Sequence, residues 1–122
     1  MAKKGGYGFG IVGCGMIADF HARAIAGMQG GHLSCVFSRS KANSDRVAKA
    51  FNCAAYQNYH AFLAHPGLDI VTIATPSGAH LEPCVQAAKA GKHIICEKPL
   101  EVTLERVDRM IRARDETRLM LA

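Results

Sequence analysis

The sequence has no long apolar run. None of its 122 residues belongs to a stretch approaching the ~20 apolar residues needed to cross a bilayer, so neither a transmembrane helix nor a membrane partner is predicted. The basic residues 1–6 precede an apolar run that glycines interrupt and that is too short for a secretory signal. With 49% hydrophobic and 20% charged residues, the composition is that of one soluble domain with a real core.

Cysteine and histidine pairs at the spacing of a metal or redox site are also missing. The five cysteines are odd in number and form no C-x-x-C pair, which argues against a disulfide framework or a zinc site. Free cysteines in this number favour a reducing cytoplasm as the location. The six histidines form no H-E-x-x-H or similar pair, so no metal is predicted.

The net charge of +5 is not concentrated in one basic cluster. Acidic residues accompany the densest basic run, a pattern typical of a solvated helix face. The run is Arg106, Arg109, Arg112 and Arg114, and its acidic neighbours are Glu105, Asp108, Asp115 and Glu116. No nucleic-acid partner is therefore predicted, and the surplus charge is better suited to attracting a phosphorylated cofactor.

Residues 7–28 predict a strand, a tight glycine turn and a helix in direct succession. An apolar run over residues 9–12 leads into Gly13, whose missing side chain permits the turn. At Gly15 the missing side chain lets the backbone approach a pyrophosphate, and Ala18 is small enough for the helix to pack on the strand. Small residues also serve plain helix–strand packing, but the flanking strand and helix favour a dinucleotide site.

The helix after this turn is expected to present its N-terminus to the phosphates. Unpaired N–H groups and the positive end of the helix dipole lie there, so we expect Met16 and Ile17 to contact the cofactor together with the two glycines. Apolar residues follow at helical spacing. They are Ile17, Ala18, Ala22, Ile25 and Met28.

Strands and helices alternate through the rest of the chain. Runs of β-forming residues predict further strands, with helical patterns between them and after the last one. These runs span residues 32–38, 54–56, 69–74 and 93–96, and residues 119–122 look like the start of a further strand. The alternation predicts an α/β fold, a Rossmann-type doubly wound parallel sheet with helices on both faces, in one dinucleotide-binding domain over residues 1–122.

Ligands of such sheets bind where the strands end. The ends here are Gly13, Ser38, Thr75 and Glu97, and unusual loop residues follow each of them. The second strand should distinguish the two dinucleotides, because an acidic residue at its end would bind the adenosine ribose of NAD. Ser38, Arg39 and Ser40 offer a guanidinium and two hydroxyls instead, which predicts NADP over NAD. Alternatively, Arg39 merely stacks on the adenine and tolerates both cofactors.

The central strand is followed by Thr75, Pro76 and Ser77, which could form a rigid wall beside the nicotinamide ribose, with His80 one helical turn away. A proline that simply stops a strand and a histidine at a helix surface are the plainer interpretations. Both remain open.

Glu97 and Lys98 carry the sharpest hypothesis. A lysine at the end of a buried strand, near a cationic nicotinamide ring, has its ammonium form disfavoured, so it can exchange a proton with a substrate hydroxyl or carbonyl. The alternative is a surface lysine paired with Glu97.

Three segments together resemble the glucose-fructose oxidoreductase / inositol dehydrogenase / MocA family. They are the turn G-C-G-M-I-A, the run D-I-V-T-I-A-T-P-S-G-A-H and the segment A-G-K-H-I-I-C-E-K-P-L. The resemblance covers essentially the whole chain and implies an NAD(P)-dependent oxidoreductase acting on sugars, polyols or related carbonyl compounds. It also implies that Lys98 is the catalytic lysine, that Glu97 lies near the nicotinamide and that a cis bond can precede Pro99.

Members of that family carry a second α/β domain with substrate contacts, a further catalytic pair and the usual oligomer interface. The resemblance therefore implies a cofactor domain that ends in its sixth strand, belongs to a homo-oligomer and does not turn over substrate alone. A non-catalytic dinucleotide-binding or sensor module is the alternative, although it would have no need of a proton-transfer group at Lys98.

Overall fold

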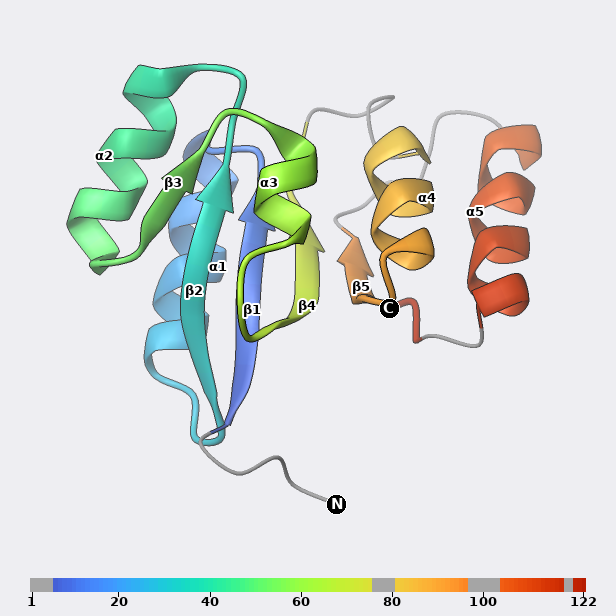
Figure 1. Ribbon diagram of the computed structural model, residues 1–122, viewed down its shortest axis with the longest axis horizontal. Helices are drawn as coiled ribbons and strands as arrows, with labels where there is room; N and C mark the ends of the chain where they lie inside the picture. Colours follow the sequence, from blue (N-terminus) through green and yellow to red (C-terminus); the bar gives the residue numbers. More distant parts are fainter. Residues whose placement is uncertain (1–5, 76–80, 97–103, 118–119) are drawn as a thin grey trace.

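The computed structural model describes residues 6–75, 81–96, 104–117 and 120–122, and its core is a five-stranded parallel sheet (Figure 1). The strand order is β3-β2-β1-β4-β5, so the direction of winding reverses between β1 and β4. The strands are β1 (Tyr7–Val12), β2 (Gly31–Phe37), β3 (Ala54–Tyr56), β4 (Leu68–Ile73) and β5 (His93–Cys96). The helices are α1 (Met16–Ala26), α2 (Lys41–Phe51), α3 (Tyr59–Leu63), α4 (Leu81–Lys89) and α5 (Leu104–Thr117). This is the Rossmann-type α/β fold that the sequence predicts.

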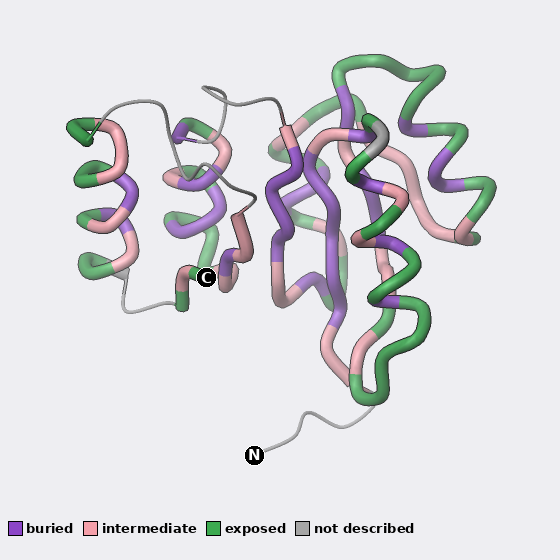
Figure 2. Tube along the Cα trace, turned by 180° about the vertical axis from the view of Figure 1, so that it is seen from behind, coloured by how far each residue is buried: buried purple, intermediate pink, exposed green. Residues whose placement is uncertain are grey.

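Two hydrophobic clusters, one on each face of the sheet, hold these layers together. The first cluster packs α1 and α2 against β1 and β2 through Ala18, Ala22 and Val47 among others. The second packs α3, α4 and α5 on the opposite face, with Phe62 and Leu81 fully buried within it. Because helices cover both faces, the central strands are buried along most of their length (Figure 2).

The helix boundaries follow from local capping. Ser40 begins α2 because its hydroxyl accepts a hydrogen bond from the Asn43 N–H at 3.2 Å, and Asn58 caps α3 through the Ala61 N–H at 2.9 Å. The α2 helix consequently starts at Lys41, inside the polar stretch 39–44 whose composition indicates a turn. Lys41, Ala42 and Asn43 form the exposed start of the helix, whereas Ser44 is buried.

The apolar face predicted for α1 is only partly buried. Ala18, Ala22 and Ile25 lie in the core, whereas Ile17 is 40% exposed and Met28 is 43% exposed. The helical spacing is right, but these two positions stand at the border of the buried face. Ile17 therefore lies at the surface beside the glycine turn.

Residues 120–122 run alongside β5. Leu121 forms a parallel bridge with Ile94, whose N–H donates to the Met120 carbonyl at 2.9 Å and whose carbonyl accepts from the Ala122 N–H at 2.8 Å. Of the four residues expected to begin a further strand, Leu119 lies outside the described residues.

The described part of the chain contains neither a disulfide nor a cluster of metal-ligating side chains. All five cysteines are free. Within the described residues there is no group of three His, Cys, Asp or Glu that could hold a metal ion, and none of the described helices is long and apolar enough to span a membrane.

Gly10 lets α3 approach the sheet closely. A Cβ built on Gly10 would lie 2.6 Å from the Phe62 Cζ and 2.8 Å from the Leu68 Cδ1, so the Phe62 ring occupies the space that a side chain would take. This contact sets the distance between α3 and β1. It thereby places the first residue of α3, Tyr59, next to the end of the sheet.

Replacing Gly10 by Ala should therefore destabilise the fold by about 1–3 kcal/mol through overpacking. Urea unfolding measures the change. Gly27→Ala is the matched control, because its Cβ would meet only ordinary contacts, the nearest 3.6 Å away. A Gly10→Ala, Phe62→Leu double variant should lose less free energy of unfolding than the two single variants lose together. Strictly additive losses would contradict this packing.

Candidate functional site

A cleft opens where β1, β2 and β4 end, at the point where the winding of the sheet reverses. Its volume is about 370 Å³. It is lined by Val12, Phe37, Arg39, Tyr59, Thr75, Glu82, Pro83 and Gln86. This is the position at which open α/β sheets bind their ligands.

The glycine turn begins at Gly13 and forms one border of the sheet edge. Gly13 has a φ of +93°, and its N–H donates to the Phe37 carbonyl at 2.8 Å. A Cβ there would lie 3.0 Å from the backbone of Ala74 and Thr75. Only glycine satisfies both the left-handed conformation and the close approach of β4.

Gly15 has a different reason for lacking a side chain. It caps α1 with an extended backbone, φ −84° and ψ −164°, which any residue can adopt. A Cβ built there would meet no protein atom within 4 Å. The missing Cβ therefore leaves room outside the protein, next to the first turn of α1.

This room lies at the N-terminal end of α1, where no side chain caps the helix. The side chains of Ser40 and Asn58 cap α2 and α3, whereas Gly15 has no side chain with which to cap α1. The N-terminal N–H groups and the positive dipole end of α1 are thus available to an external anion.

Cys14, between the two glycines, points into the protein. Its thiol donates to the Phe37 carbonyl at a sulfur–oxygen distance of 3.5 Å, and the residue is 3% exposed. Burial raises the pKa of the Cys14 thiol to about 11, against an opposing effect of the Arg46 guanidinium. The thiol is therefore neutral at physiological pH and helps to hold the turn, so it is no nucleophile.

The segment after β2 brings Arg39 to the cleft. Ser38 is buried, and its hydroxyl accepts a hydrogen bond from the Ser40 N–H at 3.1 Å. The Ser40 hydroxyl accepts the α2 capping bond, and each hydroxyl keeps its own proton for donation to a ligand. The two serines shape a tight turn that holds Arg39 exposed at the cleft.

An aromatic wall on the α3 side of the cleft has no counterpart in the sequence analysis. The Tyr59 ring stacks on Phe62 at a centroid distance of 5.7 Å and lies 5.1 Å from the Phe37 ring. Its hydroxyl donates to the Pro83 carbonyl at 2.7 Å, which joins α3 to α4, and burial raises the pKa of Tyr59 above its usual range. Only its place directly after the Asn58 cap could have drawn attention to it.

The remaining predicted site residues cannot be placed with this cleft. Pro76, Ser77, His80, Glu97 and Lys98 lie outside the described residues, and so does Pro99. The strands that precede them are described and end side by side, with Ile73 paired to Cys96. Of Met16, only the backbone is described, as the first residue of α1.

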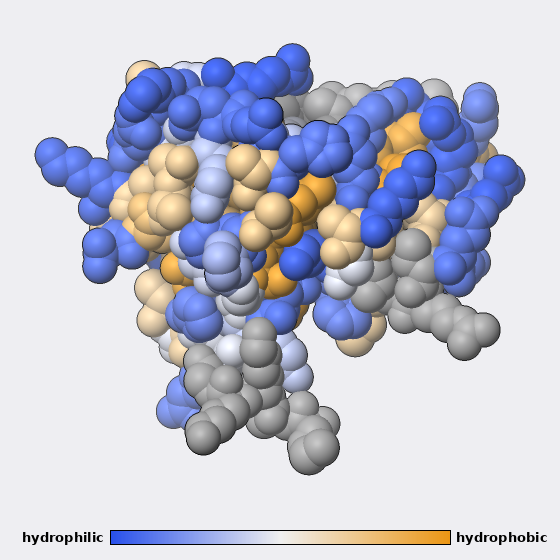
Figure 3. Space-filling view, viewed as in Figure 1, coloured by the Kyte–Doolittle hydropathy of each residue, from blue (hydrophilic) through white to orange (hydrophobic). Residues whose placement is uncertain are grey.

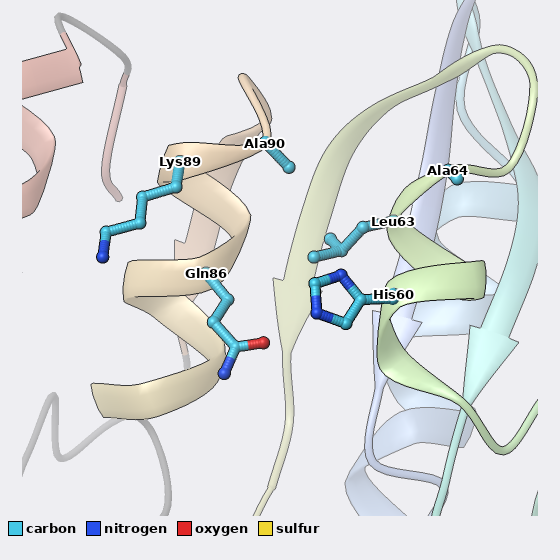
Figure 4. A pocket seen from close by; sticks show the side chains of 6 residues that line it. All are labelled: His60, Leu63, Ala64, Gln86, Lys89 and Ala90. Carbon is cyan, nitrogen blue, oxygen red and sulfur yellow. The ribbon is translucent and has the colours of Figure 1, made fainter.

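A second groove runs between α3 and α4, where hydrophobic residues reach the surface (Figure 3). Its volume is about 510 Å³, and its lining residues are His60, Leu63, Ala64, Gln86, Lys89 and Ala90. Gln86 and His60 face each other across it, while the Lys89 side chain points away (Figure 4). Because Gln86 also lines the first cleft, the groove continues from it.

The profile of GFO_IDH_MocA, described as an oxidoreductase family with an NAD-binding Rossmann fold, matches residues 7–122. The chain belongs to this family. The resemblance seen in the sequence motifs is thereby confirmed.

Relatives within the Gfo/Idh/MocA family include dehydrogenases of inositols and nucleotide sugars. Inositol 2-dehydrogenase of Rhizobium meliloti is 33% identical over 113 residues, which cover 93% of this chain and 34% of the relative. Scyllo-inositol dehydrogenase of Lactobacillus casei, solved with NAD(H) and scyllo-inositol, is 28% identical with a TM-score of 0.87 over 96% of this chain and 35% of its own. The WlbA dehydrogenase of Bordetella pertussis, solved with NADH and UDP-GlcNAcA, is 29% identical with a TM-score of 0.90. The match covers 96% of this chain and 34% of the WlbA chain. The chain thus spans about a third of the length of the Gfo/Idh/MocA proteins it matches.

Replacing each glycine of the turn by alanine should affect a different property: the stability of the fold at Gly13, and the affinity for NADH at Gly15. Gly13→Ala should lower the free energy of unfolding by about 1–3 kcal/mol, because alanine is strained at positive φ and meets the Ala74 backbone. Gly15→Ala should cost less than about 1 kcal/mol, the difference between glycine and alanine as helix caps, yet weaken NADH binding about tenfold or more. Calorimetric titration and urea unfolding of each variant test this contrast. Unchanged NADH affinity in the Gly15 variant would contradict the assignment of that space to phosphate.

Proposed function

We propose that this chain is the cofactor domain of an oxidoreductase that transfers hydride between NADP(H) or NAD(H) and a sugar, polyol or related carbonyl compound. The observation that carries the proposal is the cleft at the reversal of the sheet, which Arg39 lines, together with the glycine turn that directly follows the cleft residue Val12. The dehydrogenase names of the relatives support the substrate class.

The described residues suit the two ends of a dinucleotide differently. Val12, Phe37, Tyr59 and Pro83 offer the apolar and aromatic surface on which an adenine ring can pack. The first turn of α1, beside Gly15, suits the pyrophosphate. A cofactor laid in this way would extend from the end of β2 across β1 toward the ends of β4 and β5, where the nicotinamide would supply or accept the hydride.

The preference for NADP over NAD rests on Arg39. The β2 end carries no carboxylate to bind the ribose hydroxyls of NAD, and a guanidinium held exposed at the cleft suits a 2′-phosphate. The Ser38 and Ser40 hydroxyl protons can add to the same contact.

Arg39→Gln should accordingly raise the Kd for NADPH about tenfold and leave the Kd for NADH within about twofold, since only NADPH carries the charge that the guanidinium binds. Fluorescence titration with both cofactors measures this. Lys41→Gln is the control, because Lys41 is paired with Asp45 at 2.6 Å on the same helix. Equal affinities of the unaltered chain for NADH and NADPH would contradict the preference.

Lys98 is proposed as the residue that exchanges the substrate proton. Its support is the segment A-G-K-H-I-I-C-E-K-P-L, in which the lysine follows the last residue of β5 by two positions. In a protein that carries this chain together with the remaining length of its relatives, Lys98→Met should lower kcat by about 100-fold or more. Cofactor affinity, measured by titration, should stay within about threefold of the unaltered protein. Full turnover in the variant would refute the role.

A further inference from the structure

Arg46 of α2 contacts the glycine turn and the first helix at once. Its Nη2 donates to the Cys14 carbonyl at 3.2 Å, and its Nη1 donates to the Asp19 Oδ1 and Oδ2 at 3.3 and 3.2 Å. One guanidinium thus joins α2, the turn and the first part of α1. These contacts span 32 and 27 residues of sequence.

The bond to Cys14 sets the direction of the next amide. In a trans peptide the carbonyl of one residue and the N–H of the next lie in one plane and point in opposite directions within it. Because the Cys14 carbonyl is held toward Arg46, the Gly15 N–H is directed away from α2. This amide belongs to the residue beside which the structure leaves room for a phosphate.

The turn needs such an external restraint. Rotation of the Cys14–Gly15 peptide requires a change in φ of Gly15, and glycine adopts φ of either sign at little cost. The missing side chain that gives a phosphate room therefore also leaves the peptide free to turn over, which would present a carbonyl oxygen to the anion. The contact with Arg46 opposes that rotation.

The second contact of Arg46 concerns charge. Asp19 lies in the first turn of α1, where a carboxylate stabilises the helix but would repel a bound pyrophosphate. Its pairing with Arg46 offsets this negative charge. The side chains of Arg46 and Asp19 are 49% and 30% exposed, so the pair itself adds little to the stability of the fold.

We propose that Arg46 is a positioning residue for the cofactor pyrophosphate, acting through the Cys14–Gly15 peptide and through Asp19. The inference rests on the proposed binding of a dinucleotide. It assigns to α2 a role in pyrophosphate affinity that is separate from the role of Arg39 at the adenosine end.

Two ligands separate this role from a general loosening of the fold. ADP-ribose contains the pyrophosphate, whereas adenosine 2′-monophosphate reaches only the adenosine end. Arg46→Gln should weaken ADP-ribose about tenfold in a titration followed by ¹H–¹⁵N NMR, and leave adenosine 2′-monophosphate within about twofold. The Gly15 amide signal of the free variant should shift or broaden, because its peptide is no longer restrained.

Lys49→Gln provides the matched control, since it removes one exposed positive charge from the same helix without touching the turn. It should leave both affinities within about twofold. Arg46→Lys keeps the charge but loses the forked guanidinium that contacts both partners, so its affinity for ADP-ribose should lie between those of Arg46→Gln and Lys49→Gln. It also serves as the second variant should Arg46→Gln fold poorly.

Equal losses for both ligands in the Arg46 variants, or none for ADP-ribose, would overturn the role of Arg46 while leaving dinucleotide binding intact. Failure of the unaltered chain to bind NADH, NADPH or ADP-ribose would instead refute the proposed function, and the inference would fall with it.

Discussion

The hydrogen bond from the Gly13 N–H to the Phe37 carbonyl fixes the end of β1 to the end of β2, its neighbour on one side. On the other side of the turn, the Ala74 N–H donates to the Val12 carbonyl at 2.8 Å, so β1 is held by both neighbours up to its last residue. No side chain fits at Gly13 under this constraint. The chain must therefore turn at once, and α1 starts with its N-terminus at the edge where the strands end. The position proposed for the cofactor phosphates follows from this constraint, because it places the start of the helix.

The cleft depends on a second constraint, the close packing of α3. The Phe62 ring lies against Gly10, and this brings Tyr59 to the sheet edge, where its hydroxyl bonds to the Pro83 carbonyl of α4. This bond joins the two helices at the cleft, and the groove lined by His60 of α3 and Gln86 of α4 lies between them (Figure 4). The apolar wall proposed to hold an adenine is therefore a consequence of core packing.

Local patterns in the sequence were sufficient for the fold and for the glycine turn. The β-branched run ending at Ile73 marks a buried strand, and the spacing of Gly13 and Gly15 marks a strand–turn–helix unit, since each signal lies within a few residues. The same patterns could not show Tyr59 or Arg46 as parts of the site. Their contacts join segments 24 to 32 residues apart, and no periodicity in the chain encodes such a distance. The exposure of Ile17 could not be predicted for a related reason. Helical spacing identifies the apolar face of a helix but not the border of the part that is buried.

In the proposed site, the two glycines and Arg46 together allow a flexible turn to hold an anion firmly. A phosphate must come close to the backbone, which excludes side chains, and a backbone without side chains loses the restraint that they provide. Placing the restraint on a neighbouring helix resolves the conflict, because α2 is itself fixed by the buried Val47 and Ala48 and by the Ser40 cap. The guanidinium reaches the turn from the side away from the Gly15 N–H, so it constrains the peptide without occupying the space of the ligand. Rigidity at this site is thus supplied by a tertiary contact, while the sequence of the turn supplies only room.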